Sequence, residues 1–246
     1  MTFFKKKSIF LAFFLVSAAI FTGCAARIDG VVREGGAANL RVSTSIGPRT
    51  SALIRSFMTF MSENEQTPTL DGAAISRSMA TAPGIEQVSL KNTGPASLEG
   101  SISLTRVGDF LSLSGASGGS GKRFITYTEG RAAASSSIII NLDRNSAPEL
   151  ISMLSPEVEE NLSALMAPAV LGETSTRQEY LSLLTSFYGR PLSDEIAAAR
   201  IRVLMEFPRP VAELKGGTAS GKQAQFDIPL TDILVLEKPL QFEIIW

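Results

Sequence analysis

Cys24 has the clearest capacity for chemistry in this sequence, because it is the only cysteine among 246 residues. It follows the basic run Lys5–Lys7, the apolar stretch 8–21 and the small pair Thr22-Gly23. This order is typical of a secretory signal that is cleaved before a cysteine, which then carries acyl chains. The apolar stretch is also shorter than the ~20 residues that a helix needs to cross a bilayer. The pattern predicts acylation of Cys24, with an ordinary secretory signal or a membrane-spanning anchor as alternatives.

The motif Phe21-Thr22-Gly23-Cys24 resembles the cleavage site of bacterial lipoproteins, which is typically Leu, a small residue, Gly or Ala, then Cys. Phe21 departs from this pattern, and a bulky residue there is typical of the looser motif of spirochaetal lipoproteins. The resemblance implies that residues 1–23 are a cleaved signal peptide and that Cys24 anchors the chain in the cell envelope. Ala25 after the cysteine favours the outer membrane, at its periplasmic or surface face, over the inner membrane.

An acylated Cys24 would leave no thiol for a disulfide, a metal ion or nucleophilic catalysis. The sequence also has no histidine, which removes the usual general base near neutral pH and the commonest transition-metal ligand. Zinc hydrolysis, serine–histidine hydrolysis and haem binding all lose a group that they normally need. We therefore expect no catalytic residues, no metal site and no cofactor.

Three loop sequences match parts of catalytic or nucleotide-binding motifs. Residues 115–119 fit the nucleophile pattern G-x-S-x-G, but that motif needs a histidine. Residues 216–222 match the start of a phosphate-binding loop, but Gln223 stands where Ser or Thr should hold magnesium. Residues 116–122 are a second near match. For serine–lysine catalysis, no lysine after residue 23 has a serine three positions before it. We expect the matched sequences to be turns.

The charge of the chain argues against nucleic acid as a partner. The formal net charge is −1, and loss of the signal with Lys5–Lys7 would change it to −4. No basic cluster occurs that could follow a phosphate backbone or an anionic lipid surface. The remaining 223 residues are enough to bury a hydrophobic core.

The first half of the chain predicts strands with two helices among them. Residues 40–46 alternate apolar and polar side chains, as in a half-buried strand. Thr50 or Ser51 is expected to cap a helix with an apolar face, and a second helix is expected from Asp71 to Gly84. The face of the first helix comprises Leu53, Phe57, Phe60 and Met61. The expected strand pairs are 85–91 with 97–106 and 124–128 with 135–142.

The second half predicts helices followed by closing strands. Helices are expected from Ser155, from Thr176 to Tyr188 with Tyr180, Leu184 and Phe187 inward, and near 193–199. The remaining expectations are a strand at 201–207, a hairpin of 211–214 with 224–228 across Gly216-Gly217, a helical turn at 229–236, and a closing strand from Leu240 to Trp246.

Strands and helices thus occur in blocks, which is typical of an α+β fold with antiparallel sheets. We predict a single domain over 37–246 with a helical insertion at about 147–199. Residues 24–36 are expected to be a tether or the first strand of a hairpin. This layout, with a lipidated cysteine and a closing strand that ends in Trp246, resembles the mycobacterial LppM-type lipoproteins.

These features favour a binding, scaffold or assembly role in the envelope over catalysis. The expected partners are the membrane, through acylated Cys24, and another envelope protein. A carrier of an apolar ligand or lipid is the alternative, because the helix 53–61 is rich in Met and Phe. A hydrolase that uses carboxylates or a Ser/Lys pair is the third hypothesis.

Overall fold

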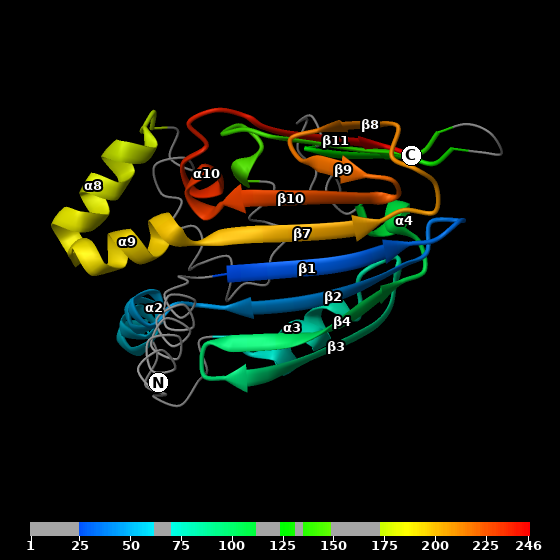
Figure 1. Cartoon of the computed structure of the whole chain (residues 1–246). Coiled ribbons are helices and arrows are strands. Elements are labelled where there is room, and N and C mark those ends of the chain that lie inside the picture. The colour runs from blue at the N-terminus through cyan, green and yellow to red at the C-terminus, as the bar shows by residue number, and fades with distance from the viewer. Residues whose placement is uncertain (1–24, 62–69, 112–123, 131–134, 149–172) are drawn as a thin grey trace, which may run out of the picture.

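The computed structural model describes residues 25–61, 70–111, 124–130, 135–148 and 173–246. Two β-sheets and several helices occupy these ranges, which confirms the predicted α+β class (Figure 1). The strands are β1 Ala25–Val32, β2 Ala38–Ser45, β3 Ile85–Gly94, β4 Ser97–Leu104, β5 Ile125–Thr128, β6 Ser137–Leu142, β7 Arg200–Glu206, β8 Glu213–Lys215, β9 Thr218–Ser220, β10 Gln223–Pro229 and β11 Leu240–Ile245. The helices are α2 Pro48–Met61, α3 Gly72–Met79, α4 Val107–Leu111, α8 Arg177–Tyr188, α9 Arg190–Ala198 and α10 Leu230–Val235.

The larger sheet has the strand order β3-β4-β2-β1-β7-β10-β9. Its strands are antiparallel except where β1 runs parallel to β7, with Ala25 opposite Arg200. Of the two alternatives for residues 24–36, residues 25–32 form a strand, and β1 makes a hairpin with β2. The first residue of β1 therefore lies beside the point where α9 leads into β7.

The smaller sheet has the order β5-β6-β11-β8 and packs against the larger one. Apolar side chains from both sheets share one buried cluster, to which β1, β4 and β10 contribute from one side and β11 from the other. The expected closing strand is present as β11, and Trp246 after it exchanges both backbone hydrogen bonds with Ser136, at 2.9 and 3.0 Å. Trp246 is therefore held both by these backbone bonds and by its packing in the core between the sheets.

A second buried cluster lies where the helices meet the sheets, and its members include Tyr180, Leu184 and Leu234. Helix α8 begins with a capping box, in which Thr176 and Glu179 bond reciprocally to each other's backbone. Glu195 of α9 accepts hydrogen bonds from the backbone N–H groups of Arg49 and Thr50, at 3.1 and 2.7 Å. This carboxylate satisfies the first turn of α2 and connects two helices that are distant in the sequence.

The predicted hairpin of 211–214 with 224–228 is wrong. Strand β8 pairs with β11 in the smaller sheet, whereas β10 pairs with β7 and β9 in the larger one. Gly216 and Gly217 lie where the chain passes between the sheets. A Cβ on Gly216 would come within 2.6 Å of Gln241 O, and one on Gly217 within 2.5 Å of Gln225 O. The two glycines therefore allow close approach to both sheets rather than a simple turn.

Several helix boundaries and one buried face also differ from the predictions. Helix α2 begins at Pro48, so Thr50 lies in its first turn rather than at its cap, and α9 begins at Arg190 rather than near 193. Tyr180 and Leu184 of α8 are buried as expected, but Phe187 is 77% exposed. Phe187 lies in the last turn of α8, beyond the core that buries the other two residues.

The hairpins formed by β3 with β4 and by β5 with β6 confirm the predicted strand pairs. None of the helices within the described ranges has the length and hydropathy needed to cross a membrane. Cys24, the predicted helix at Ser155 and the loop 114–121 lie outside the described residues.

Phe207 is 1% exposed and packs in the cluster between the two sheets. We expect Phe207→Ala to lower the free energy of unfolding by about 3–5 kcal/mol, because the lost side chain leaves a cavity. Chemical denaturation of the purified protein would measure this loss. Phe187→Ala is the matched control and should change stability by less than about 0.5 kcal/mol. Equal effects of the two substitutions would contradict this account of the core.

Candidate functional site

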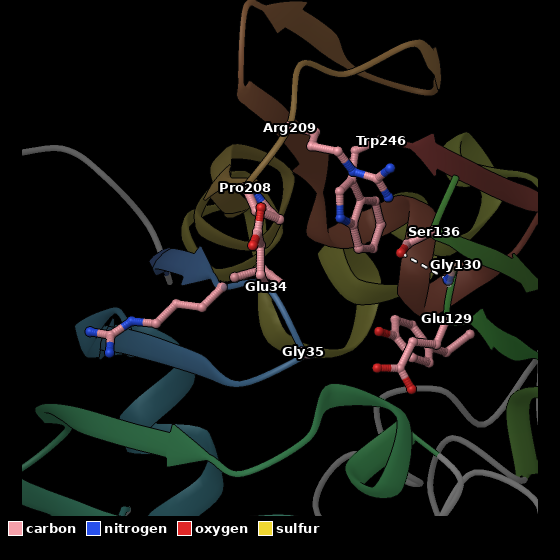
Figure 2. Close-up of a pocket in the computed structure, with 12 residues that line it drawn as sticks. Glu34, Gly35, Glu129, Gly130, Ser136, Pro208, Arg209 and Trp246 are labelled. Atoms are coloured by element: carbon pink, nitrogen blue, oxygen red, sulfur yellow. Dashed lines mark hydrogen bonds between the residues drawn. The ribbon is translucent and has the colours of Figure 1, made fainter. Parts of the chain in front are cut away.

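A hollow of about 290 Å³ lies at the end of the sheets where the β1–β2 turn, the described residues at the end of β5 and before β6, and the segment after β7 meet. We call it the distal hollow. Figure 2 shows the side chains around it, which come from both sheets and from the crossing between them. The lining residues are Val32, Arg33, Glu34, Gly35, Gly36, Tyr127, Glu129, Gly130, Ser136, Pro208, Arg209 and Trp246.

The β1–β2 turn forms one side of the distal hollow. Gly35 and Gly36 both have φ of 81°, a left-handed conformation that strains other residues. The turn is closed by hydrogen bonds from Arg33 N to Ala37 O at 2.7 Å and from Gly36 N to Arg33 O at 3.1 Å. Gly36 O also accepts a hydrogen bond from Val107 N. This side of the hollow is therefore held by the backbone.

Trp246 forms the aromatic floor. It is 4% exposed, and its ring centroid lies 4.5 Å from that of Phe207 and 6.4 Å from that of Tyr127. The backbone bonds to Ser136 hold the residue at the edge of β6. An indole fixed in this way is preorganised, and the small part of it that is exposed offers an apolar contact to a ligand.

Polar groups on and after β5, which lie close to Gly36 of the turn, form another part of the lining. Glu129 accepts a hydrogen bond from the Arg106 guanidinium at 2.7 Å, and Ser136 Oγ accepts one from Gly130 N at 3.1 Å. Both partners of the ion pair are partly exposed, so it contributes little stability and mainly orients Glu129. Burial raises the pKa of the Tyr127 hydroxyl, and the Glu129 carboxylate raises it further, while Arg106 opposes both effects. Tyr127 is therefore a neutral hydrogen-bonding group.

Charges of both signs surround the hollow, and Figure 2 shows Glu34, Glu129 and Arg209 around it. Among the described residues, no group of three or more acidic, histidine or cysteine side chains could hold a metal ion. The arrangement combines an aromatic surface with hydrogen-bonding and charged groups, which suits non-covalent recognition.

A second and more open hollow, of about 910 Å³, lies between α8 and α9. Most of its lining residues are of polar type, including Gln178, Thr185, Ser186 and Asp194. Helices α8 and α9 lie at the end of the sheets opposite the β1–β2 turn (Figure 1), so the two hollows are at opposite ends.

The motif match at 216–222 does not line the distal hollow, and the matches at 115–119 and 116–122 lie outside the described residues. Residues 216–222 include β9 and Gly221, which has φ of 58°, and they lead into β10 rather than into a helix. The phosphate-loop match is therefore a turn between strands, as expected. Tyr127, Glu129 and Arg209 were missed, because no motif connects them. The expected hairpin strand within residues 24–36 and the closing strand that ends in Trp246 were the available signals, and neither indicated a binding site.

Comparison with known proteins gives one weak likeness. No family model matches the sequence, and no curated protein matches it. The fold is similar to the NMR structure of the folded domain of the Mycobacterium tuberculosis protein LppM, with a TM-score of 0.41 and 9% sequence identity. The alignment covers 91% of this chain and 89% of that one.

Because its pKa is raised, Tyr127 should lose its proton at a higher pH than an ordinary tyrosine does. The phenolate absorbance that the unsubstituted protein shows and Tyr127→Phe lacks belongs to Tyr127. We expect this absorbance to rise with a titration midpoint above the usual tyrosine pKa of about 10. Because the pKa is raised in the folded state, its contribution to stability is present below about pH 10 and is lost as pH rises through the raised pKa. A difference titration of the two proteins by absorbance measures the midpoint for Tyr127. A midpoint at or below about 10 would contradict the stated burial.

Proposed function

We propose that the protein is a lipid-anchored protein of the bacterial envelope that binds another envelope protein at the distal hollow without catalysis. The observation that carries this proposal is the direction of β1. Its first residue, Ala25, follows Cys24 directly, and its last residue, Val32, lines the distal hollow. One strand thus connects the site of attachment with the site of binding.

The length of β1 separates these two sites. Eight residues at about 3.3 Å per residue span about 25 Å. An acylated Cys24 would hold the Ala25 end at the membrane surface, so the distal hollow would face away from the bilayer. This orientation supports a partner that approaches from the aqueous side of the envelope.

The size and chemistry of the hollow favour a protein segment. A volume of about 290 Å³ is near the lower limit for ligand pockets and accommodates one or two side chains. The Trp246 floor would contact an apolar part of such a segment, and Glu34 could pair with a basic group on it. The apolar-ligand carrier gains no such support, because charged side chains line both described hollows.

The sheet edges do not favour binding by strand addition. Helix α3 packs against the long edge strand β3, where Leu90 N donates a hydrogen bond to Ser76 Oγ. The other edge strands, β5, β8 and β9, have only three or four residues. Short or covered edges protect a sheet from pairing with another chain. The distal hollow is therefore the better candidate for the partner.

Acylation can be tested directly. We expect the mature protein to begin at residue 24 and to carry acyl chains, and Cys24→Ser to abolish both processing and membrane attachment. Mass spectrometry of the detergent-extracted protein and membrane fractionation measure these outcomes. Ala25→Ser is the matched control and should remain acylated. Unchanged processing and attachment in Cys24→Ser would contradict the proposed anchor.

Partner binding can be tested by photo-crosslinking in intact cells. A benzophenone amino acid at position 34, on the rim of the distal hollow, should form an adduct with an envelope protein. The same group at position 91, an exposed lysine toward the other end of the edge strand β3, is the control. An adduct at 34 alone supports the proposal. The absence of an adduct at 34, or the same adduct at both positions, would refute it.

A further inference from the structure

Three exposed apolar side chains gather where α8 meets α9. Leu183, Phe187 and Tyr188 are 47%, 77% and 47% exposed, the largest values for big apolar residues in the described part of the chain. Leu183 and Phe187 are four positions apart and so lie on one side of the helix. The Phe187 and Tyr188 ring centroids are 6.4 Å apart. We call these three residues the α8–α9 corner.

The corner lies at the same end of the molecule as the start of β1. Ala25 is opposite Arg200, which directly follows α9 and Ala199. Helix α9 extends from there beyond the end of the sheet (Figure 1). Its nine residues, at 1.5 Å each, carry the corner about 14 Å away from the sheet.

The proposed anchor leaves almost no spacer at this end. Cys24 directly precedes the first residue of β1, and one extended residue spans at most about 3.6 Å. A bilayer that holds acyl chains on Cys24 would therefore lie close to the end of the sheet. Since α9 projects much farther than this tether reaches, the corner would meet the same bilayer. This step rests on the acylation of Cys24 proposed above.

We propose that the α8–α9 corner inserts into the boundary between the headgroups and the acyl chains of the membrane that holds Cys24. Aromatic side chains are enriched at this depth, and interfacial segments bury their apolar face about 5–10 Å into it. Phe187, the most exposed of the three, would reach deepest. Tyr188 would keep its hydroxyl among the headgroups.

The charges beside the corner indicate whether insertion needs an anionic membrane surface. Arg190 follows the corner and pairs with Asp194 at 3.6 Å, so this pair adds no net charge. The side of α8 that faces α9 is polar and includes Ser182, Thr185 and Ser186. Insertion therefore depends on apolar contact, and a zwitterionic lipid is sufficient. Together, the acyl chains and the corner would fix the orientation of the domain on the membrane.

A single thiol placed at the corner tests this proposal in the full acylated chain. Because acylation consumes Cys24, Phe187→Cys supplies the only free thiol for an environment-sensitive fluorophore. The labelled lipoprotein is reconstituted into phosphatidylcholine vesicles that contain a nitroxide lipid with its spin label near the headgroup. We expect a blue-shifted emission that loses most of its intensity to the nitroxide.

Two matched variants serve as controls. Thr185→Cys places the fluorophore on the polar side of the same helix, and Glu34→Cys places it at the distal hollow. Both should emit as in water, and the quencher should leave the probe at 34 unaffected. The same low quenching at 187 and 34 on vesicle-bound protein would overturn the proposal. A shifted but unquenched probe at 187 would also overturn it, because a protein surface or a second copy would then cover the corner.

Failure of the anchor itself gives a different result. A protein that lacks acyl chains would not float with the vesicles, and the Phe187→Cys variant would take up two fluorophores, one of them at Cys24. Low quenching with one fluorophore and complete flotation would therefore reject the inserted corner while retaining the anchor.

Discussion

The packing of Trp246 against Phe207 is the interaction on which the rest of the structure depends. Phe207 follows β7 in the larger sheet, and Trp246 follows β11 in the smaller one, with 4.5 Å between their ring centroids. Large aromatic surfaces contribute strongly to a core, so this contact holds the two sheets together where the chain passes from one to the other. The same indole is the floor of the distal hollow. Folding and the candidate site thus depend on one contact.

Strand β1 runs between two ends of the molecule that differ in structure. Its first residue lies beside the helices α2 and α9, and its last residue reaches the distal hollow. In the proposed arrangement, the helical end meets the membrane and the hollow faces the aqueous side. This separation needs no hinge or second domain, because a hydrogen-bonded strand in the middle of a sheet is a rigid spacer.

Local patterns predicted most of the elements but not all of their partners. Alternation identified β2 and β11, and the spacing of Tyr180 and Leu184 identified α8. The hairpin expected around Gly216-Gly217 was wrong, because two strands adjacent in sequence belong to different sheets. The distal hollow could not be found from local signals, since Tyr127, Arg209 and Trp246 meet only through pairings between distant strands.

The sequence by itself determined the α+β class, the absence of histidine and the single cysteine behind an export-like segment. Only the tertiary structure decided which strands pair, which groups gather around the distal hollow, and that Phe187 is exposed while Tyr180 and Leu184 are buried. The physical reason is that periodicity reports an apolar helix face but not the surface that covers it. The core covers only the part of α8 that it reaches, and the last turn extends beyond it.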